Sequence, residues 1–277
     1  MGRSTGELRQ IAREIRRTIL KMTNRAGAGH VGGSMSEADI LTALYFSEMN
    51  IDPKRADMEN RDRFILSKGH SSPGLYAALA HRGYFDMSIL DTFDEVDSML
   101  QSHPDMHKCP GIDYSTGSLG QGLSIGVGIA QGGGMRGRTF RTYVLIGDGE
   151  SQEGQIWEAV MYAGVRTVKR LIAVIDNNRV QLSSKSDENI DPMPYEEKFR
   201  AFRWQALTAD GHDFDSLIPA LRKAAEMSEA GPVALIANTV KGKGVSFMEG
   251  RYQWHGVAPN DEQLAAALAE IDKEGVA

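Results

Sequence analysis

Apolar residues are spaced along the chain in patterns that predict alternating helices and strands. Through residues 7–22 they recur every three or four positions, which is the pattern of an amphipathic helix. A second helical pattern covers residues 36–48, and the Ser-Glu-Ala-Asp stretch at its start can cap a helix. The glycine-rich residues 27–33 are expected to form the loop between these two helices.

Further along, three short apolar runs are typical of buried parallel strands, since each is rich in β-branched residues and ends in turn-forming or charged residues: residues 141–147, 170–176 and 232–240. A helical pattern over 156–165 separates the first two runs, and another over 214–230 precedes the third. This alternation predicts a doubly wound α/β fold, in which a mostly parallel sheet carries helices on both faces.

Composition and charge narrow the class of protein. The chain has 277 residues and a net charge of −6, and it contains no long basic run, which argues against a nucleic-acid or anionic-membrane surface. No stretch approaches the roughly 18 apolar residues of a membrane span. Cys109 is the only cysteine, so neither an intrachain disulfide nor a cysteine metal cluster can form. The expected compartment is therefore a reducing cytoplasm.

An aspartate between two glycines follows the first predicted strand, and two asparagines follow the second. Because ligands bind at the carboxyl ends of parallel strands, Asp148 and Asn178 are expected to be neighbours in space. Their side-chain oxygens suit Mg²⁺, which often bridges to phosphate. Gly147 and Gly149 let backbone amides approach an anion at the N-terminus of the following helix. Either piece alone is more typical of an ordinary turn, but together they predict a metal-bridged diphosphate.

The pair of Asp148 and Asn178, 30 positions apart, resembles the thiamine-diphosphate signature. From about residue 7 to residue 259, the chain is similar to the N-terminal, diphosphate-binding half of transketolase, in the form made as a separate subunit. That resemblance implies a single thiamine-diphosphate-binding domain over residues 1–277. Six stretches carry it, in this order: GAGHVGGSMSEADIL (27–41), RDRFILSKGHSSPGLYAALA (61–80), QSHPDM (101–106), STGSLGQGLSIGVGIA (115–130), GDGESQEGQIWEA (147–159) and KGKGVSFMEGRYQWHG (241–256).

The resemblance also implies which residues form the site. Mg²⁺, or Ca²⁺ or Mn²⁺ in its place, would be bound by Asp148, Asn178 and the main-chain carbonyl of Val180. Four histidines would be catalytic, since imidazole can move protons near neutral pH: His30, His70, His103 and His255. Thiamine diphosphate would be bound by His70, Gly117, Ser118, Leu119, Gly147, Asp148, Gly149, Glu150, Glu153, Asn178, Val180 and His255. The remaining histidines are expected to be surface or loop-capping residues: His81, His107 and His212.

Within the site, the resemblance implies separate roles for three of the histidines. His30 and His255 would act as acid and base at the donor carbonyl and the C3 hydroxyl, and His103 would bind the C1 hydroxyl. In the family, the glutamate that corresponds to Glu153 lies at the subunit contact that links two active sites.

Part of a transketolase site has no counterpart in this sequence. In the family, a glutamate that contacts the pyrimidine ring and the arginines that bind the sugar phosphate belong to the other half of the protein. We therefore expect the partner to be a C-terminal transketolase subunit, in a two-plus-two heterotetramer. Only that assembly would transfer a ketol unit from a ketose donor to an aldose acceptor. The sequence does not name the sugars, and a specialised ketose, such as a sulfonated one, stays open.

Two other functions stay open at this point. The α subunit of a 2-oxo-acid dehydrogenase shares the Gly-Asp-Gly and asparagine signature, although the stretches SKGH, QSHPDM and STGSLGQG argue against it. A non-catalytic scaffold could keep the same fold without the chemistry. Binding of the cofactor together with Mg²⁺ would separate a scaffold from an enzyme.

Overall fold

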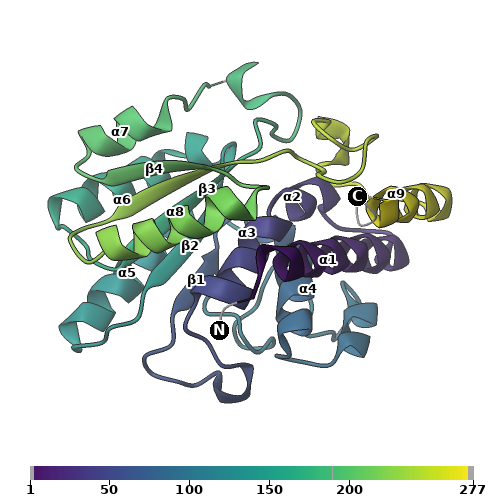
Figure 1. The fold of residues 1–277 in the computed structure, drawn as a ribbon, viewed down its shortest axis with the longest axis horizontal. Helices are drawn as coiled ribbons and strands as arrows, with labels where there is room; N and C mark the ends of the chain where they lie inside the picture. The colour runs from purple at the N-terminus through teal and green to yellow at the C-terminus, as the bar shows by residue number, and fades with distance from the viewer. Residues whose placement is uncertain (1–2, 189, 274–277) are drawn as a thin grey trace.

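A five-stranded parallel sheet lies at the centre of the molecule (Figure 1). The computed structural model describes residues 3–188 and 190–273, and in this part of the chain the strand order is β1-β2-β3-β5-β4. The strands have these bounds: β1 Arg63–Leu66, β2 Thr142–Gly147, β3 Leu171–Asn177, β4 Gln205–Asp210 and β5 Val233–Asn238. All four neighbouring pairs are parallel, so every strand ends at the same edge of the sheet.

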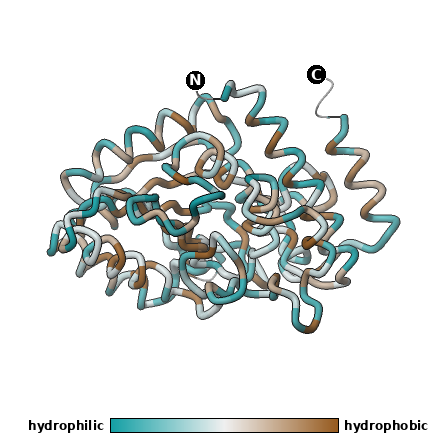
Figure 2. Tube along the Cα trace, turned by 90° about the horizontal axis from the view of Figure 1, so that it is seen from below, coloured by the Kyte–Doolittle hydropathy of each residue, from teal (hydrophilic) through white to brown (hydrophobic). Residues whose placement is uncertain are grey.

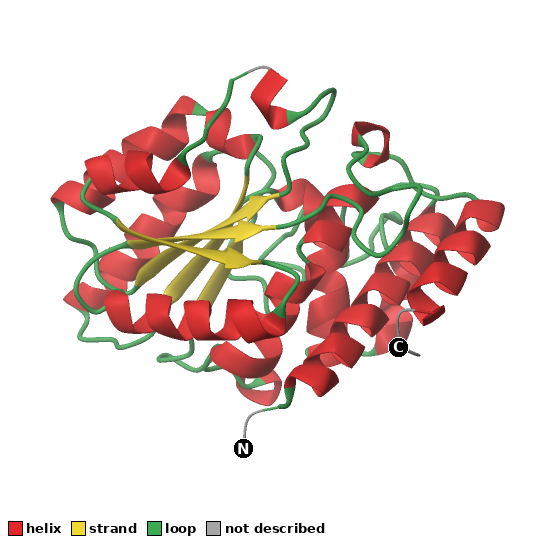
Figure 3. Ribbon diagram, turned by 45° about the horizontal axis from the view of Figure 1, so that its top comes forward, coloured by secondary structure: helices red, strands yellow, loops and turns green. Residues whose placement is uncertain are grey.

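Helices cover both faces of this sheet (Figure 3). Their bounds are α1 Thr5–Ala26, α2 Val31–Ser36, α3 Ala38–Ala43, α4 Ser72–Arg82, α5 Gln121–Met135, α6 Gly154–Val165, α7 Tyr195–Ala201, α8 Phe214–Met227 and α9 Asp261–Lys273. Alternate residues of each central strand enter two separate cores. Tyr143 of β2 packs in the core shared with α1, α3, α4 and α8, whereas the next residue, Val144, packs in the core shared with α5, α6 and α7. The predicted doubly wound α/β fold is confirmed.

Most of the elements predicted from the hydrophobic pattern are present in the structure. The predicted strands correspond to β2, β3 and β5, and the predicted helices 7–22, 156–165 and 214–230 correspond to α1, α6 and α8. Hydrophilic and hydrophobic residues alternate along the outer helices, as expected for helices that bury one face (Figure 2). Within the described residues, the structure offers no helix with the length and apolarity needed to traverse a bilayer.

The second predicted helix, residues 36–48, was wrong in its start and in its continuity. Helical structure begins at Val31, inside the predicted loop, and α2 ends at Ser36 before α3 and a π-helical stretch, Leu44–Glu48. Gly32 serves close packing rather than a turn, whereas Gly27 and Gly29 adopt positive φ values in the loop before it. A Cβ atom on Gly32 would lie 2.8 Å from the carbonyl oxygen of Trp254, so only glycine allows this approach.

Candidate active site

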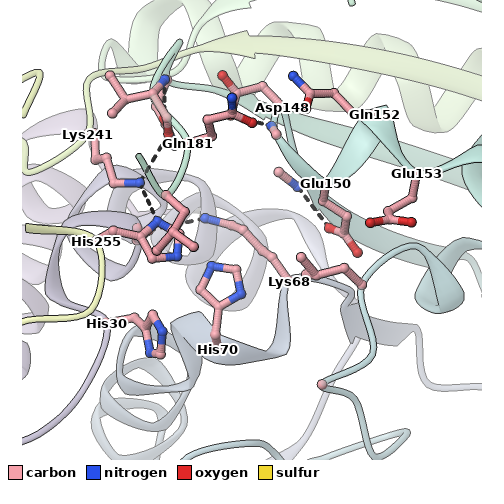
Figure 4. Close-up of a pocket in the computed structure, with 18 of the residues that line it drawn as sticks. His30, Lys68, His70, Asp148, Glu150, Gln152, Glu153, Gln181, Lys241 and His255 are labelled. Atoms are coloured by element: carbon pink, nitrogen blue, oxygen red, sulfur yellow. Dashed lines mark hydrogen bonds between the residues drawn. The ribbon is translucent and has the colours of Figure 1, made fainter. Parts of the chain in front are cut away.

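A cavity of about 600 Å³ opens at the carboxyl edge of the sheet. It collects nearly all of the predicted site residues, from segments far apart in the sequence: His30, His70, His103, Gly117, Leu119, Gly147, Asp148, Gly149, Glu150, Glu153, Asn178, Val180 and His255. Ser118 is the one predicted residue that does not line this cavity; its side chain is exposed. Figure 4 shows His30, His70, His255 and Lys241 on one side of the cavity, with Asp148, Glu150 and Glu153 on the other.

Asp148 is a buried carboxylate at the end of β2. One carboxylate oxygen, Oδ1, accepts a hydrogen bond from the Gly149 amide at 2.8 Å, and Oδ2 accepts one from the Ser186 hydroxyl at 2.7 Å. The residue is only 2% exposed, and burial raises the pKa of its carboxyl group. Among the described residues, Asp148 has no ion-pair partner. A bound cation would therefore compensate a charge that is otherwise costly to bury.

Asn178 and Val180 supply neutral oxygens beside this carboxylate. The Asn178 amide donates to Asp176 Oδ2 at 3.1 Å, which orients its own oxygen toward the backbone N–H of Val180, also at 3.1 Å. The carbonyl oxygen of Val180 accepts from Lys241 Nζ at 3.1 Å. Asp176 lies beside Gly147 in the parallel register, so the predicted proximity of the two strand ends is confirmed.

These oxygens fit a hard divalent cation. One carboxylate, one amide oxygen and one carbonyl are the ligand types that Mg²⁺ takes when phosphate and water complete its coordination. No group of three histidine, cysteine or acidic side chains is arranged for a metal anywhere in residues 3–188 and 190–273. A transition-metal centre built from such side chains is thus not a feature of the described structure, whereas an oxygen-ligated site agrees with it.

Three of the predicted histidines cluster in the cavity. The ring centroids of His30, His70 and His255 lie 4.9–5.3 Å apart. Burial, reinforced by the charge of Lys68, lowers the pKa of His70 to about 2, and burial with the charge of Lys241 lowers that of His255 to about 3. Burial also lowers the pKa of His30. All three rings are therefore neutral near pH 7 and can accept or donate a hydrogen bond.

The remaining predicted residues that line the cavity differ in how exposed they are. His103 is exposed and packs beside Gly117, whose φ of +156° accommodates the loop. Glu153 is exposed, whereas Glu150 is buried. The Glu150 carboxylate accepts from the Ser67 hydroxyl at 2.5 Å and from the amides of Gly120 and Gly147 at 2.9 and 3.0 Å. Glu150 thus joins three loops, and its oxygens are already engaged within the protein.

Two lysines in the cavity were not identified from the sequence. Lys241 is 2% exposed, and its ammonium contacts His255 Nδ1 at 2.8 Å and the Val180 carbonyl but forms no ion pair with any described carboxylate. Burial lowers the pKa of Lys241 to about 8. Lys68 is also buried, but Asp176 and Glu37 lie 2.6 and 2.8 Å from its nitrogen. Although burial opposes its charge, these two carboxylates raise the pKa of Lys68. Lys241 is therefore the cation available to an anionic ligand.

Comparisons with known proteins show which family the chain belongs to. The family described as "Transketolase, thiamine diphosphate binding domain" matches residues 8–272. The 6-deoxy-6-sulfo-D-fructose transketolase subunit of Clostridium sp. (strain MSTE9) is 46% identical over 270 residues, which are 97% of this chain and 98% of that protein. An apulose-4-phosphate transketolase subunit of Phocaeicola vulgatus is 39% identical, over 93% of this chain and 91% of that protein.

Longer transketolases match over part of their length. Human transketolase is 35% identical over 250 residues, which are 90% of this chain but 39% of that protein. The structure of transketolase from Leishmania mexicana superimposes with a TM-score of 0.90 at 27% identity and covers 98% of this chain and 42% of that one. The chain belongs to the transketolase family, of which it represents the thiamine diphosphate-binding domain.

Proposed function

We propose that this chain is the cofactor-binding subunit of a two-subunit transketolase that uses thiamine diphosphate and Mg²⁺. The observation that carries the proposal is the convergence, in one cavity, of buried Asp148, buried Lys241 and a cluster of neutral histidines. This carboxylate and this ammonium form no ion pair within the described part of the chain, so they suit a ligand that brings both a cation and a diphosphate.

In this proposal, Asp148, Asn178 and the carbonyl of Val180 hold the cation. Lys241, His70 and His255 face the diphosphate, with the amide of Gly149 nearby. Gly117 and Leu119 line the pyrimidine end, where the exposed side chain of Leu119 offers an apolar surface. Ca²⁺ or Mn²⁺ could replace Mg²⁺ because both accept the same oxygen ligands.

Bound thiamine diphosphate supplies a nucleophilic carbon and an electron sink for cleaving the bond next to a ketone. The histidines of this chain then handle protons on the sugar. His30 and His255, both neutral, can take a proton from a hydroxyl or hydrogen-bond a carbonyl oxygen of a ketose donor. In the same proposal, His103, which is exposed and lines the cavity, contacts a terminal hydroxyl of the donor.

We propose that a C-terminal transketolase subunit completes the site, in a two-plus-two assembly. This chain spans about two fifths of the length of the longer transketolases, and three relatives of similar length carry the word subunit in their names. Exposed apolar side chains at the rim of the cavity support the same conclusion, since a covering protein would bury them: Leu119, Leu182 and Ile190.

For the substrate, we propose a specialised ketose with an anionic group at its far end. The support comes from two relatives, whose names specify 6-deoxy-6-sulfo-D-fructose and apulose 4-phosphate. The greater identity, 46% against 39%, favours the sulfonated sugar as the first donor to test. An aldose phosphate, such as glyceraldehyde 3-phosphate, is a suitable acceptor for the assay.

Activity of the assembled and the isolated subunits tests the proposal. The chain alone, with thiamine diphosphate and Mg²⁺, is expected to bind the cofactor but to show no ketol transfer. Co-expression with the proposed partner is expected to restore transfer from at least one ketose in a panel of sulfonated and phosphorylated sugars. Full turnover by the isolated chain would contradict the two-subunit proposal, and cofactor binding without transfer in the assembly would favour the scaffold.

A further inference from the structure

His212 connects an ion pair in the core to the chain segment that carries Lys241. This histidine lies in the turn after β4, outside the cavity, and its side chain is 13% exposed. Its Nδ1 lies 2.7 Å from Asp39 Oδ2, and the backbone N–H of Val240 donates to its Nε2 at 2.8 Å. Arg16 in turn pairs with the Asp39 carboxylate, and both side chains are buried.

These contacts fix the ring in one chemical form. An Nε2 atom that accepts a hydrogen bond must carry a lone pair, so the ring proton is on Nδ1 and is donated to Asp39. Burial alone would raise the pKa of Asp39, but the charge and hydrogen bonds of Arg16, together with His212, hold it below its ordinary value. The acceptor is thus an ionised carboxylate, which fixes the orientation of the ring.

The segment that His212 holds leads directly into the cavity. Strand β5 ends at Asn238, and three residues later Lys241 reaches Val180 and His255. Two backbone hydrogen bonds hold this segment. The N–H of Thr239 donates to the Asn177 carbonyl at 3.2 Å, and the N–H of Gly242 donates to the Gly32 carbonyl at 3.0 Å. Val240 lies between these two residues in the sequence.

We propose that His212 is a positioning residue for Lys241, acting through the backbone of Val240. The hydrogen bond to Nε2 fixes the peptide that precedes Lys241, and so fixes the point from which its side chain extends into the cavity. The inference rests on the proposed function, since it assigns Lys241 to the cofactor diphosphate. It goes beyond that function because His212 itself touches neither cavity nor ligand.

Two substitutions separate the two hydrogen bonds of the ring. In His212→Gln, the amide oxygen stands in for Nε2, so the Val240 contact is kept and the Asp39 contact is lost. In His212→Asn, the amide nitrogen stands in for Nδ1, so the Asp39 contact is kept and the Val240 contact is lost. His107→Asn, at an exposed histidine, is the matched control.

The affinity of the full chain for thiamine diphosphate with Mg²⁺ is measured by calorimetry, alone and with its partner. The melting temperature of each variant is measured alongside to show that it folds. We expect about a tenfold weaker affinity in His212→Asn, the scale of one hydrogen bond, and less than about a twofold change in His212→Gln and His107→Asn. In a Lys241→Met background, His212→Asn should weaken binding no further, because the residue it positions is gone.

Each alternative outcome overturns the inference. A tenfold loss in His212→Gln, or parent-like affinity in His212→Asn, would show that the Val240 contact does not govern binding. An equal loss from His212→Asn with and without Lys241 would show that the effect does not act through Lys241. If His212→Asn fails to fold, a loss of affinity in His212→Gln still overturns the inference, since the inference requires that variant to bind like the parent. Failure of the parent chain to bind the cofactor would contradict the proposed function itself. That result differs from the outcomes above, in all of which the parent chain binds the cofactor.

Discussion

Gly147 of β2 lies directly beside Asp176 of β3 in the parallel register of the sheet. Because the two strands end together, the residues that follow them enter the same cavity. Asp148 comes one residue after Gly147, and Asn178 comes two residues after Asp176. The register thus brings two side chains 30 positions apart in the sequence to the same place, which is the geometric basis of the proposed cation site.

Lys241 provides a direct test of diphosphate binding. Replacing it with methionine keeps most of the side-chain volume but removes the only cavity lysine without a described carboxylate partner. We expect thiamine diphosphate to bind about tenfold more weakly or worse, as measured by calorimetry at saturating Mg²⁺. Lys241→Arg keeps the charge and should lose less. Equal losses in the two variants would argue that shape rather than charge matters at this position.

The lowered pKa values of His70 and His255 predict how stability changes with pH. In the unfolded chain, these histidines bind protons below their ordinary pKa of 6.5. In the folded protein, the buried rings become protonated only at about pH 2–3. Their contribution to stability is therefore complete above pH 6.5 and falls as the pH is lowered through that value. We expect the melting temperature to drop between about pH 7.5 and pH 5, and to drop less in His70→Asn. An identical pH dependence in parent and variant would contradict neutral burial of His70.

Glu150 is predicted to matter for folding because its carboxylate accepts three hydrogen bonds. In Glu150→Gln, an amide N–H would replace one acceptor and would face either the Gly147 or the Gly120 N–H, depending on its orientation. We expect the free energy of unfolding to fall by about 1–3 kcal/mol in urea titration. Glu158→Gln, at an exposed position of α6, is the control and should change it by less than about 0.5 kcal/mol. A neutral Glu150→Gln would mean that these loops are not held together by the carboxylate.

Gly164 tests the packing of α6, the helix that follows Asp148. A Cβ atom at this position would lie 1.7 Å from the carbonyl oxygen of Phe202. Gly164→Ala should therefore lower the free energy of unfolding by about 3 kcal/mol or more, because backbone must move. The matched control is Gly128→Ala in α5, where no atom lies within 4 Å and alanine should stabilise the helix by up to about 1 kcal/mol. Similar effects of the two substitutions would contradict the close approach of α6 to Phe202.

Strands and helices with a strong apolar period could be predicted from the sequence, and those without one could not. β1 has only four residues, and β4, at the edge of the sheet, buries only Ala206 and Ala209, so neither forms a long continuous apolar run. Residues 31–33 were predicted as a loop because glycine favours turns. Gly32 instead admits a close backbone contact, which depends on the distant Trp254.

Within the candidate site, resemblance located the histidines and the oxygen ligands but did not single out Lys241. The sequence KGKG contains two lysines whose environments differ completely. Lys241 is 2% exposed, whereas the side chain of Lys243 is 33% exposed and lies 3.5 Å from Glu249. Nothing in the local sequence distinguishes them, because burial of Lys241 depends on segments from Val180 and His255. The hydrogen bond from the Val240 N–H to His212 likewise depends on how two segments pack in the folded chain, so the local sequence does not predict it.

The central claim is that Asp148 binds a divalent cation that anchors the diphosphate. Calorimetry of thiamine diphosphate binding, with Mg²⁺ and with a chelator, in the parent chain, in Asp148→Ala and in the exposed control Asp187→Ala, tests it most directly. We predict tight binding that requires Mg²⁺ in the parent and the control, and an affinity reduced by about a hundredfold or more in Asp148→Ala. Cofactor binding that persists in the chelator, or equal affinity in Asp148→Ala and the parent, would contradict the claim.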